Sequence, residues 1–209
     1  MAAFAIDNPF LNAGTFIAQT SSAAVAYFGL IAYFDRPRGK VLIENPSSAL
    51  RIGPSQIPNA GLGLYASRNL PKGTKLGTYP GVVRPLQKSL KKLMYHPQCE
   101  AYIWRFTDNS KIIDPTDSEG NIQNICFGGS EETPFSLFFM KNIMKFSVET
   151  TLTRINEPPV GFGGCNVCAN EDLNKREVLF EVIRDINEGE ELYMDYGISY
   201  DRSSYGSNN

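Results

Sequence analysis

Two short motifs, far apart in the chain, carry residue types that could bind a ligand and act on it. In Gly61-Leu62-Gly63, the two glycines would let a ligand approach the backbone closely enough to use its amide and carbonyl groups. In Asp195-Tyr196-Gly197, a phenol could orient a reacting group. Each motif also has a plainer interpretation. Paired glycines serve bulges and turns, and many of the 10 Tyr and 13 Phe residues must pack in a core.

The order of the other motifs along the chain adds to the significance of these two. They are, in sequence order, Ile57–Ala66, Leu70–Gly73, Gly77–Val83, Tyr102, Ile113–Thr116, Gly120-Asn121, Arg154–Asn156, Asn166-Val167 and Arg184–Leu192. The whole series, from about Leu50 to Gly197, resembles the SET-domain family of protein-lysine methyltransferases. The resemblance implies a mainly β fold (α+β) with short helices and small curved sheets. It also implies a C-terminal pseudoknot that places Asn156 beside Asp195-Tyr196, an exception to the rule that chains avoid threading.

The resemblance further implies a cofactor, S-adenosyl-L-methionine, and the residues that bind it. Gly61, Leu62 and Gly63 match the cofactor loop of the family, whose backbone would hold the methionine portion and the adenine side. Arg154 and Asn156 match the arginine and the asparagine of another family motif. Asn156 would then bind the amino group or the carboxylate of the cofactor.

Three tyrosines match the positions at which the family carries out its chemistry. Tyr196 matches the tyrosine nearest the transferred methyl group and so also contacts the cofactor, while Tyr79 and Tyr102 match tyrosines that line the lysine channel. The attacking amine must be neutral, although an unperturbed lysine has a pKa of about 10.4. Because an aromatic channel and a nearby sulfonium both lower this pKa, orientation by hydroxyl and carbonyl groups can replace a strong base. The expected partner is a protein, histone or non-histone, with an exposed lysine.

Three features depart from the family pattern. Glu157 stands where the family has a histidine, and Met194 replaces a common aromatic residue. An insertion at about 122–150 precedes Arg154 and could be a lid, a substrate wall or an added hairpin. These departures leave an alternative open, namely a catalytically inactive SET-like module that binds a protein partner.

The elements that must position these residues are expected to be short strands joined by turns. Glycine and proline, with 18 and 13 residues in the chain, punctuate it as they do in β-rich folds. Strands are predicted at 62–66, 75–83, 178–184 and 191–196, with a hairpin formed by 102–106 and 111–114. A helix is predicted over 86–94, with Leu86, Leu90 and Leu93 on one face. Glu190 and Glu191 are expected on a solvated turn and strand.

The chain is expected to have three parts: an N-terminal apolar segment (1–40), a SET-like catalytic domain (41–200) and a flexible tail (201–209). Residues 17–34 are mostly apolar and lie near the short end of the length that spans a membrane. A membrane anchor, a helix packed on the domain and a poorly ordered leader are the three interpretations of this segment. In the first, the basic residues that follow would stay on the cytoplasmic side, so the domain would face the cytosol.

Composition narrows the set of partners and sites. The net charge is −2, and the absence of a basic stripe argues against direct binding of nucleic acid. A mildly acidic domain suits a cationic protein substrate. The single C-x-x-C pair, Cys165 and Cys168, and the single histidine, His96, do not make a zinc framework, so no metal site is predicted and the thiols are expected to be reduced.

Overall fold

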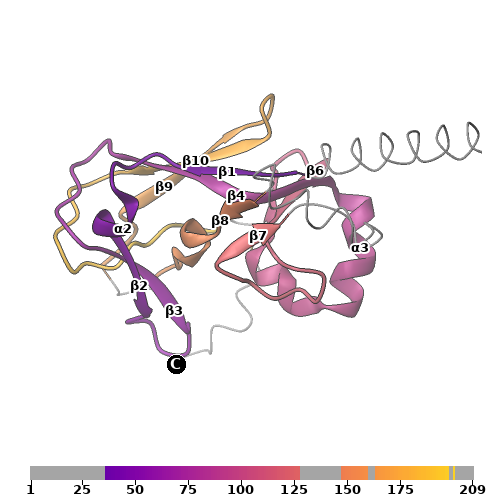
Figure 1. Ribbon diagram of the computed structural model, residues 1–209, viewed down its shortest axis with the longest axis horizontal. Helices are drawn as coiled ribbons and strands as arrows, with labels where there is room; N and C mark the ends of the chain where they lie inside the picture. Colours follow the sequence, from indigo (N-terminus) through magenta and orange to yellow (C-terminus); the bar gives the residue numbers. More distant parts are fainter. Residues whose placement is uncertain (1–35, 128–146, 160–162, 198–199, 201–209) are drawn as a thin grey trace, which may run out of the picture.

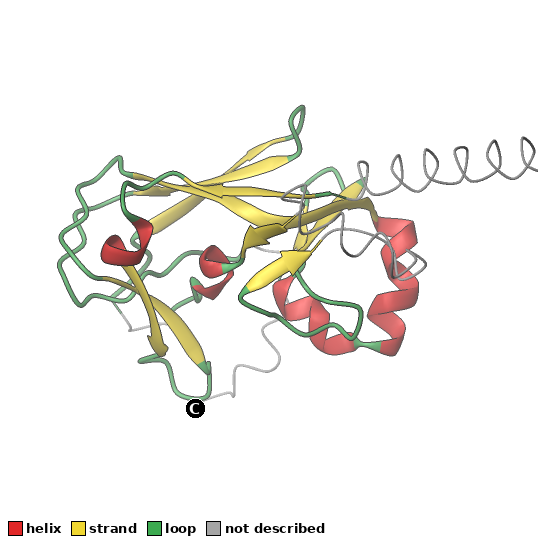
Figure 2. Ribbon diagram, in the orientation of Figure 1, coloured by secondary structure: helices red, strands yellow, loops and turns green. Residues whose placement is uncertain are grey.

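Strands make up most of the regular structure in the computed structural model, which describes residues 36–127, 147–159, 163–197 and 200 (Figure 2). The helices in this part of the chain are short. They are α2 (Pro46–Ala49), α3 (Leu86–Tyr95) and the 3-10 helices η1 (Pro97–Tyr102) and η2 (Thr151–Arg154). The predicted fold class, mainly β with short helices, is confirmed.

One antiparallel sheet of six strands forms the body of the molecule (Figure 1). Its order is β5 (Trp104–Arg105), β6 (Lys111–Asp114), β4 (Lys75–Pro85), β10 (Glu177–Val182) and β9 (Val167–Asp172), and β1 (Pro37–Val41) also pairs with β4. The sheet curls, since the indole Nε1 of Trp104 on β5 donates to Glu171 on the opposite edge strand β9 at 2.7 Å. The two edges therefore approach within the reach of one side chain.

The core is built on β4 and β10. Val178, Phe180 and Val182 are buried while their neighbours are only half-buried, the alternation expected of a strand with one face on the core. Leu152 of η2 and Ile155, which follows it, pack in the same cluster. This packing holds η2 against the sheet and fixes the start of the segment 155–157.

Two smaller ladders flank the main sheet. β2 (Leu50–Pro54) pairs with β3 (Leu62–Ala66), and β7 (Ile125–Phe127) pairs with β8 (Ser147–Glu149). The hairpin β2–β3 carries the predicted cofactor loop at its tip. The ladder β7–β8 forms the base of the predicted insertion, most of which lies outside the described residues.

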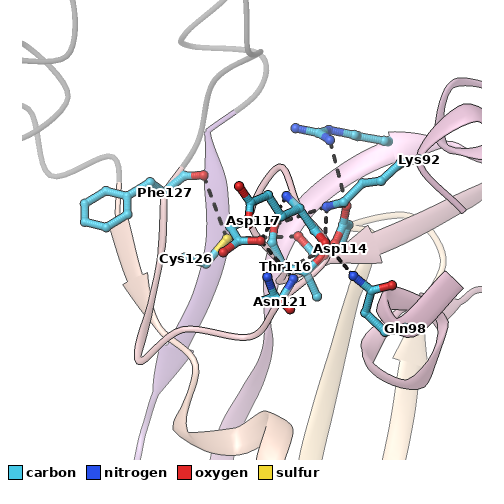
Figure 3. Close-up of polar contacts among 10 residues, drawn as sticks. Lys92, Gln98, Asp114, Thr116, Asp117, Asn121, Cys126 and Phe127 are labelled. Carbon is cyan, nitrogen blue, oxygen red and sulfur yellow. Dashed lines mark hydrogen bonds and ion pairs between the residues drawn. The ribbon is translucent and has the colours of Figure 1, made fainter. Parts of the chain in front are cut away.

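Helix α3 is fixed to β6 through the buried carboxylate of Asp114 (Figure 3). Lys92 Nζ lies 2.7 Å from Asp114 Oδ2 and 2.7 Å from the hydroxyl of Thr116, whose backbone N–H donates to Asp114 Oδ1 at 3.0 Å. This contact turns Lys92 toward the sheet and leaves Leu90 55 % exposed. The sequence placed Leu86, Leu90 and Leu93 on one face, and the buried ion pair decides how the helix is rotated.

Most of the predicted elements are present with small changes in length. The strands β3, β4 and β10, the helix α3 and the hairpin β5–β6 lie where the sequence predicted them. Tyr102 is an exception, since it ends η1 instead of lying in a strand. Residues 191–196 form only isolated bridges, from Glu191 to Tyr65 and from Tyr193 to Asn156.

The C-terminal segment lies between parts of the chain that are distant in sequence. The N–H of Leu192 donates to the carbonyl of Leu64 at 2.7 Å, and the N–H of Met194 donates to that of Asn156 at 2.9 Å. The N–H of Tyr193 donates to the side chain of Asn166 at 2.7 Å. These contacts place Asn156 next to the segment that carries Tyr196, as the resemblance implied.

No helix in the described part of the chain is long and apolar enough to cross a membrane. Residues 17–34 and the tail 201–209 lie outside the described residues. The three interpretations of the N-terminal segment therefore stay predictions, as do the boundaries of the three parts.

Replacing Phe180 with alanine should lower the free energy of unfolding by about 3–5 kcal/mol, because it leaves a cavity where three aromatic rings meet. Leu173, which is 38 % exposed, provides the control, and Leu173→Ala should change stability by no more than about 0.5 kcal/mol. Urea unfolding followed by circular dichroism measures both variants. Equal losses would show that Phe180 does not belong to the folding core.

Candidate active site

A pocket of about 750 Å³ opens where the two edges of the curled sheet approach each other. The three tyrosines predicted to act on a substrate, Tyr79, Tyr102 and Tyr196, all line it. They come from β4, from the end of η1 and from the C-terminal segment. The fold thus gathers in one cavity three phenol rings that are far apart in sequence.

Tyr196 is held at both ends. Its hydroxyl donates to the carbonyl of Ile155 at 3.0 Å, and its backbone N–H donates to Oε1 of Glu157 at 3.0 Å. Its ring also packs edge-on against that of Tyr200, with the centroids 4.6 Å apart. The segment 155–157 therefore sets the position of this phenol.

Tyr79 is buried, and its hydroxyl proton is used in a hydrogen bond within the protein. Its hydroxyl donates to the carbonyl of Tyr102 at 2.5 Å, and its ring lies 5.7 Å from that of Trp104. Burial, with the negative charge of Asp114 second, raises the pKa of the Tyr79 phenol far above its ordinary value. Tyr79 is therefore a neutral phenol whose oxygen can only accept a further hydrogen bond.

Glu171 lines the pocket, and Arg154 contacts one of its lining residues, Tyr102. The guanidinium of Arg154 lies over the ring of Tyr102, 5.9 Å from its centroid. Glu171 accepts hydrogen bonds from Trp104 Nε1 and from both the N–H and the hydroxyl of Thr107. Because these donors occupy its carboxylate, Glu171 ties the two sheet edges together.

A second cluster centres on the carboxylate of Glu191, which is only 1 % exposed. It accepts four hydrogen bonds, at distances of 2.7 to 3.2 Å, from Ser55 Oγ, the N–H of Gln56, the hydroxyl of Tyr193 and Asn156 Nδ2. The hydroxyl of Tyr65 also lies 3.1 Å from it, but this phenol shares its single proton with the carbonyl of Pro54 at 2.5 Å. Burial favours the neutral acid, but these hydrogen bonds outweigh it and hold the pKa of Glu191 below its ordinary value. The expectation that Glu191 lies on a solvated strand was therefore wrong.

The two glycines of the predicted cofactor loop are each favoured for a different structural reason. A Cβ at Gly63 would overlap the carboxylate of Glu191. A Cβ at Gly61 would meet nothing within 4 Å, but its φ of 72° lies in the left-handed region that glycine adopts readily. Gly63 thus makes room for Glu191, while the backbone at Gly61 faces open space.

Asn156 joins this loop to the C-terminal segment. Its Nδ2 donates to the carbonyl of Leu62 at 3.1 Å and to Glu191 at 3.2 Å, and its own carbonyl accepts from Met194. Asn156 and the loop Gly61–Gly63 do not line the described pocket, although Thr153 and Ile155 just before Asn156 do. The predicted site residues therefore form two groups that meet at the segment 155–157.

Sequence reasoning did not assign a role to Glu191 and saw Glu157 only as a departure from a family pattern. The partners of Glu191 come from three distant parts of the chain, so its own neighbours in sequence give no sign of its burial. The replacement of histidine at Glu157 was a visible signal, but its partner, the N–H of Tyr196, lies 39 residues away.

Gly63→Ala should lower the free energy of unfolding by about 2–4 kcal/mol, because the new methyl group displaces Glu191 from its donors. Gly61→Ala should cost only the strain of the left-handed backbone, about 1–2 kcal/mol. A double-mutant cycle measured by urea unfolding separates the two causes. In a Glu191→Ala background, Gly63→Ala should add little further loss, and full additivity would contradict the proposed overlap.

The stability of the protein should also depend on pH through Glu191. Because its pKa in the folded state is lowered, its contribution is fully present above the unfolded value of about 4.3 and is lost as the pH falls through the folded value. Glu191→Gln should therefore lose less stability than the wild type between pH 6 and pH 3. Parallel slopes of unfolding free energy against pH in the two proteins would contradict this.

Comparison with known proteins agrees with these observations. The SET domain family matches residues 61–197, which span both groups of site residues. No protein of curated function matches the chain.

Solved structures of Polycomb Repressive Complex 2 from Chaetomium thermophilum have a similar fold. One, bound to an inhibitor, is 18 % identical with a TM-score of 0.50, and the match covers 76 % of this chain and 17 % of that one. Another, in an autoinhibited conformation bound to S-adenosylmethionine, is 19 % identical with a TM-score of 0.48. This match covers 73 % of this chain and 16 % of that one. The chain thus spans less than a fifth of the length of these matched chains. The family match extends over most of the sequence, and the chain belongs to the SET-domain family, which is typical of protein-lysine methyltransferases that use S-adenosylmethionine.

Proposed function

We propose that this protein transfers a methyl group from S-adenosyl-L-methionine to a lysine side chain of a protein. The observation that carries the proposal is the convergence of Tyr79, Tyr102 and Tyr196 on one pocket of about 750 Å³. This volume is large enough for a lysine side chain and part of the peptide around it. The aromatic walls would desolvate the amine and so favour its neutral, reactive form.

The hydroxyls of Tyr79 and Tyr196 can orient the lysine amine. A phenol has one proton, and Tyr79 gives its proton to the carbonyl of Tyr102 while Tyr196 gives its proton to the carbonyl of Ile155. Each oxygen can then only accept an N–H from the substrate. Two such acceptors would fix the N–H bonds of the amine and leave its lone pair aimed at the methyl donor, which is catalysis by orientation.

The residues around Gly61 suit the cofactor. S-adenosylmethionine supplies an electrophilic methyl group on a sulfonium when it is bound. The open side of the Gly61 backbone leaves room for a ligand, and Leu62, which is 44 % exposed, offers an apolar surface to an aromatic base. Since Asn156 Nδ2 is committed to Leu62 and Glu191, its Oδ1 is the atom suited to an amino group. We assign this site to Gly61, Leu62, Gly63 and Asn156, with Arg154 supporting the wall at Tyr102.

Tyr196→Phe should lower the rate of methyl transfer by about 10²-fold, because the amine loses one of its two orienting acceptors. Affinity for S-adenosylmethionine, measured by isothermal titration calorimetry, should change by less than about threefold, since the ring stays in place. Tyr95, which is 64 % exposed on α3, provides a matched control in Tyr95→Phe. Incorporation of radiolabelled methyl groups into proteins of a cell extract measures the rate.

Two outcomes would contradict the proposal. If the wild type binds no S-adenosylmethionine, the methyl-transfer function is wrong, and the alternative of a catalytically inactive module is favoured. If Tyr196→Phe labels substrates as fast as the wild type does, the role given to Tyr196 is wrong.

A further inference from the structure

Three consecutive residues hold the C-terminal segment in place. The carbonyl of Ile155 accepts from the hydroxyl of Tyr196, and the carbonyl of Asn156 accepts from the N–H of Met194. The third contact is made by a side chain, since the carboxylate of Glu157 accepts from the N–H of Tyr196 at 3.0 Å. Glu157 is only 9 % exposed. The residues on both sides of Asn156, Ile155 and Glu157, therefore both accept hydrogen bonds from Tyr196.

We propose that Glu157 is a positioning residue for Tyr196, and that its carboxylate fixes the backbone from which the phenol projects into the pocket. The proposal rests on the methyl-transfer function argued above. A fully buried N–H without a partner costs about 1–3 kcal/mol, and at the half-buried Tyr196 amide Glu157 supplies the acceptor that avoids part of this cost. A hydrogen bond to an ionised acceptor is roughly twice as strong as a neutral one, which makes a carboxylate a firm anchor.

The local backbone shows why a side-chain acceptor is needed. Gly197, directly after Tyr196, has a φ of 84°, and its N–H donates to Oδ1 of Asp195 at 2.7 Å. The chain therefore turns away at this point and leaves its extended path. Because residues 191–196 form only isolated bridges, Glu157 supplies at Tyr196 the acceptor that a neighbouring strand would provide in a regular ladder.

Glu157 could instead act through its negative charge. It lies close enough to Cys165 to raise the pKa of that thiol, after burial and together with Asp195. Near a substrate amine, the same charge would favour the protonated and unreactive form. A positioning role and a charge role therefore predict different results when the charge is removed but the acceptor oxygen is kept.

The test compares Glu157→Ala, Glu157→Gln and the exposed control Glu188→Ala in the full chain. Glu157→Ala should lower kcat by about 10-fold to 100-fold, because the phenol is no longer held at its productive angle. The KM for S-adenosylmethionine should change by less than threefold, since the loop Gly61–Gly63 and Asn156, which hold most of the cofactor in the proposed function, do not depend on Glu157. Glu157→Gln, which keeps an acceptor oxygen, should recover kcat to within about threefold of the wild type.

A second readout does not depend on activity. Hydrogen exchange of the Tyr196 amide, followed by nuclear magnetic resonance, should become at least about tenfold faster in Glu157→Ala but not in Glu157→Gln or Glu188→Ala. Unchanged exchange in Glu157→Ala would overturn the proposal, and so would a Gln variant as impaired as the Ala variant. If the wild type itself shows no turnover, the proposed function fails, and the exchange data alone still decide whether Glu157 holds Tyr196.

Discussion

The burial of the Glu191 carboxylate is the constraint on which the rest of the site depends. An ionised carboxylate removed from water is costly unless hydrogen bonds replace its hydration. Glu191 meets this requirement with four donors, drawn from residues 55–56, from Asn156 and from its own segment, while Tyr65 of β3 shares its proton between Glu191 and the carbonyl of Pro54. A carboxylate has about four lone-pair positions, so these donors saturate it. The hairpin, the segment 155–157 and the C-terminal segment must therefore assemble together.

The segment 155–157 divides the site into two halves. Toward the hairpin, Asn156 donates to Leu62 and Glu191, while toward the pocket, Ile155 and Glu157 hold Tyr196. Under the proposed function, one short stretch of backbone separates the cofactor loop from the lysine pocket. A shift of this stretch would disturb both halves, which explains why a buried polar network, and not apolar packing alone, secures it.

Sequence reasoning predicted the parts of the fold that depend on local pattern. The strands at 62–66 and 75–83, the helix after Pro85 and the hairpin at Asp108-Asn109 follow from glycine and proline punctuation, helical spacing and turn residues, and all are present. The meeting of Tyr79, Tyr102 and Tyr196 was implied only by resemblance to a family, since no local rule brings distant strands together. In the structure all three tyrosines line one pocket.

Where local reasoning failed, a long-range polar contact was the cause. Helical spacing places Leu86, Leu90 and Leu93 on one face but does not fix how the helix is rotated, which Lys92 decides by its contact with the carboxylate of Asp114, 22 residues further along the chain. Glu191 is buried because hydroxyl groups as distant as Ser55 and Tyr65 converge on it. Glu157 was visible as an unusual residue, but its contact with the N–H of Tyr196 depends on how the C-terminal segment crosses the segment 155–157.

The most direct measurement is to incubate the full chain with a cell extract and S-adenosylmethionine that carries an isotopically labelled methyl group, and then to locate the label by mass spectrometry. If the tyrosine-lined pocket transfers methyl groups to lysine, the label will appear on lysine side chains of particular proteins, and only when the enzyme is present. Label on no residue, or equally in extract without the enzyme, would contradict the proposed function.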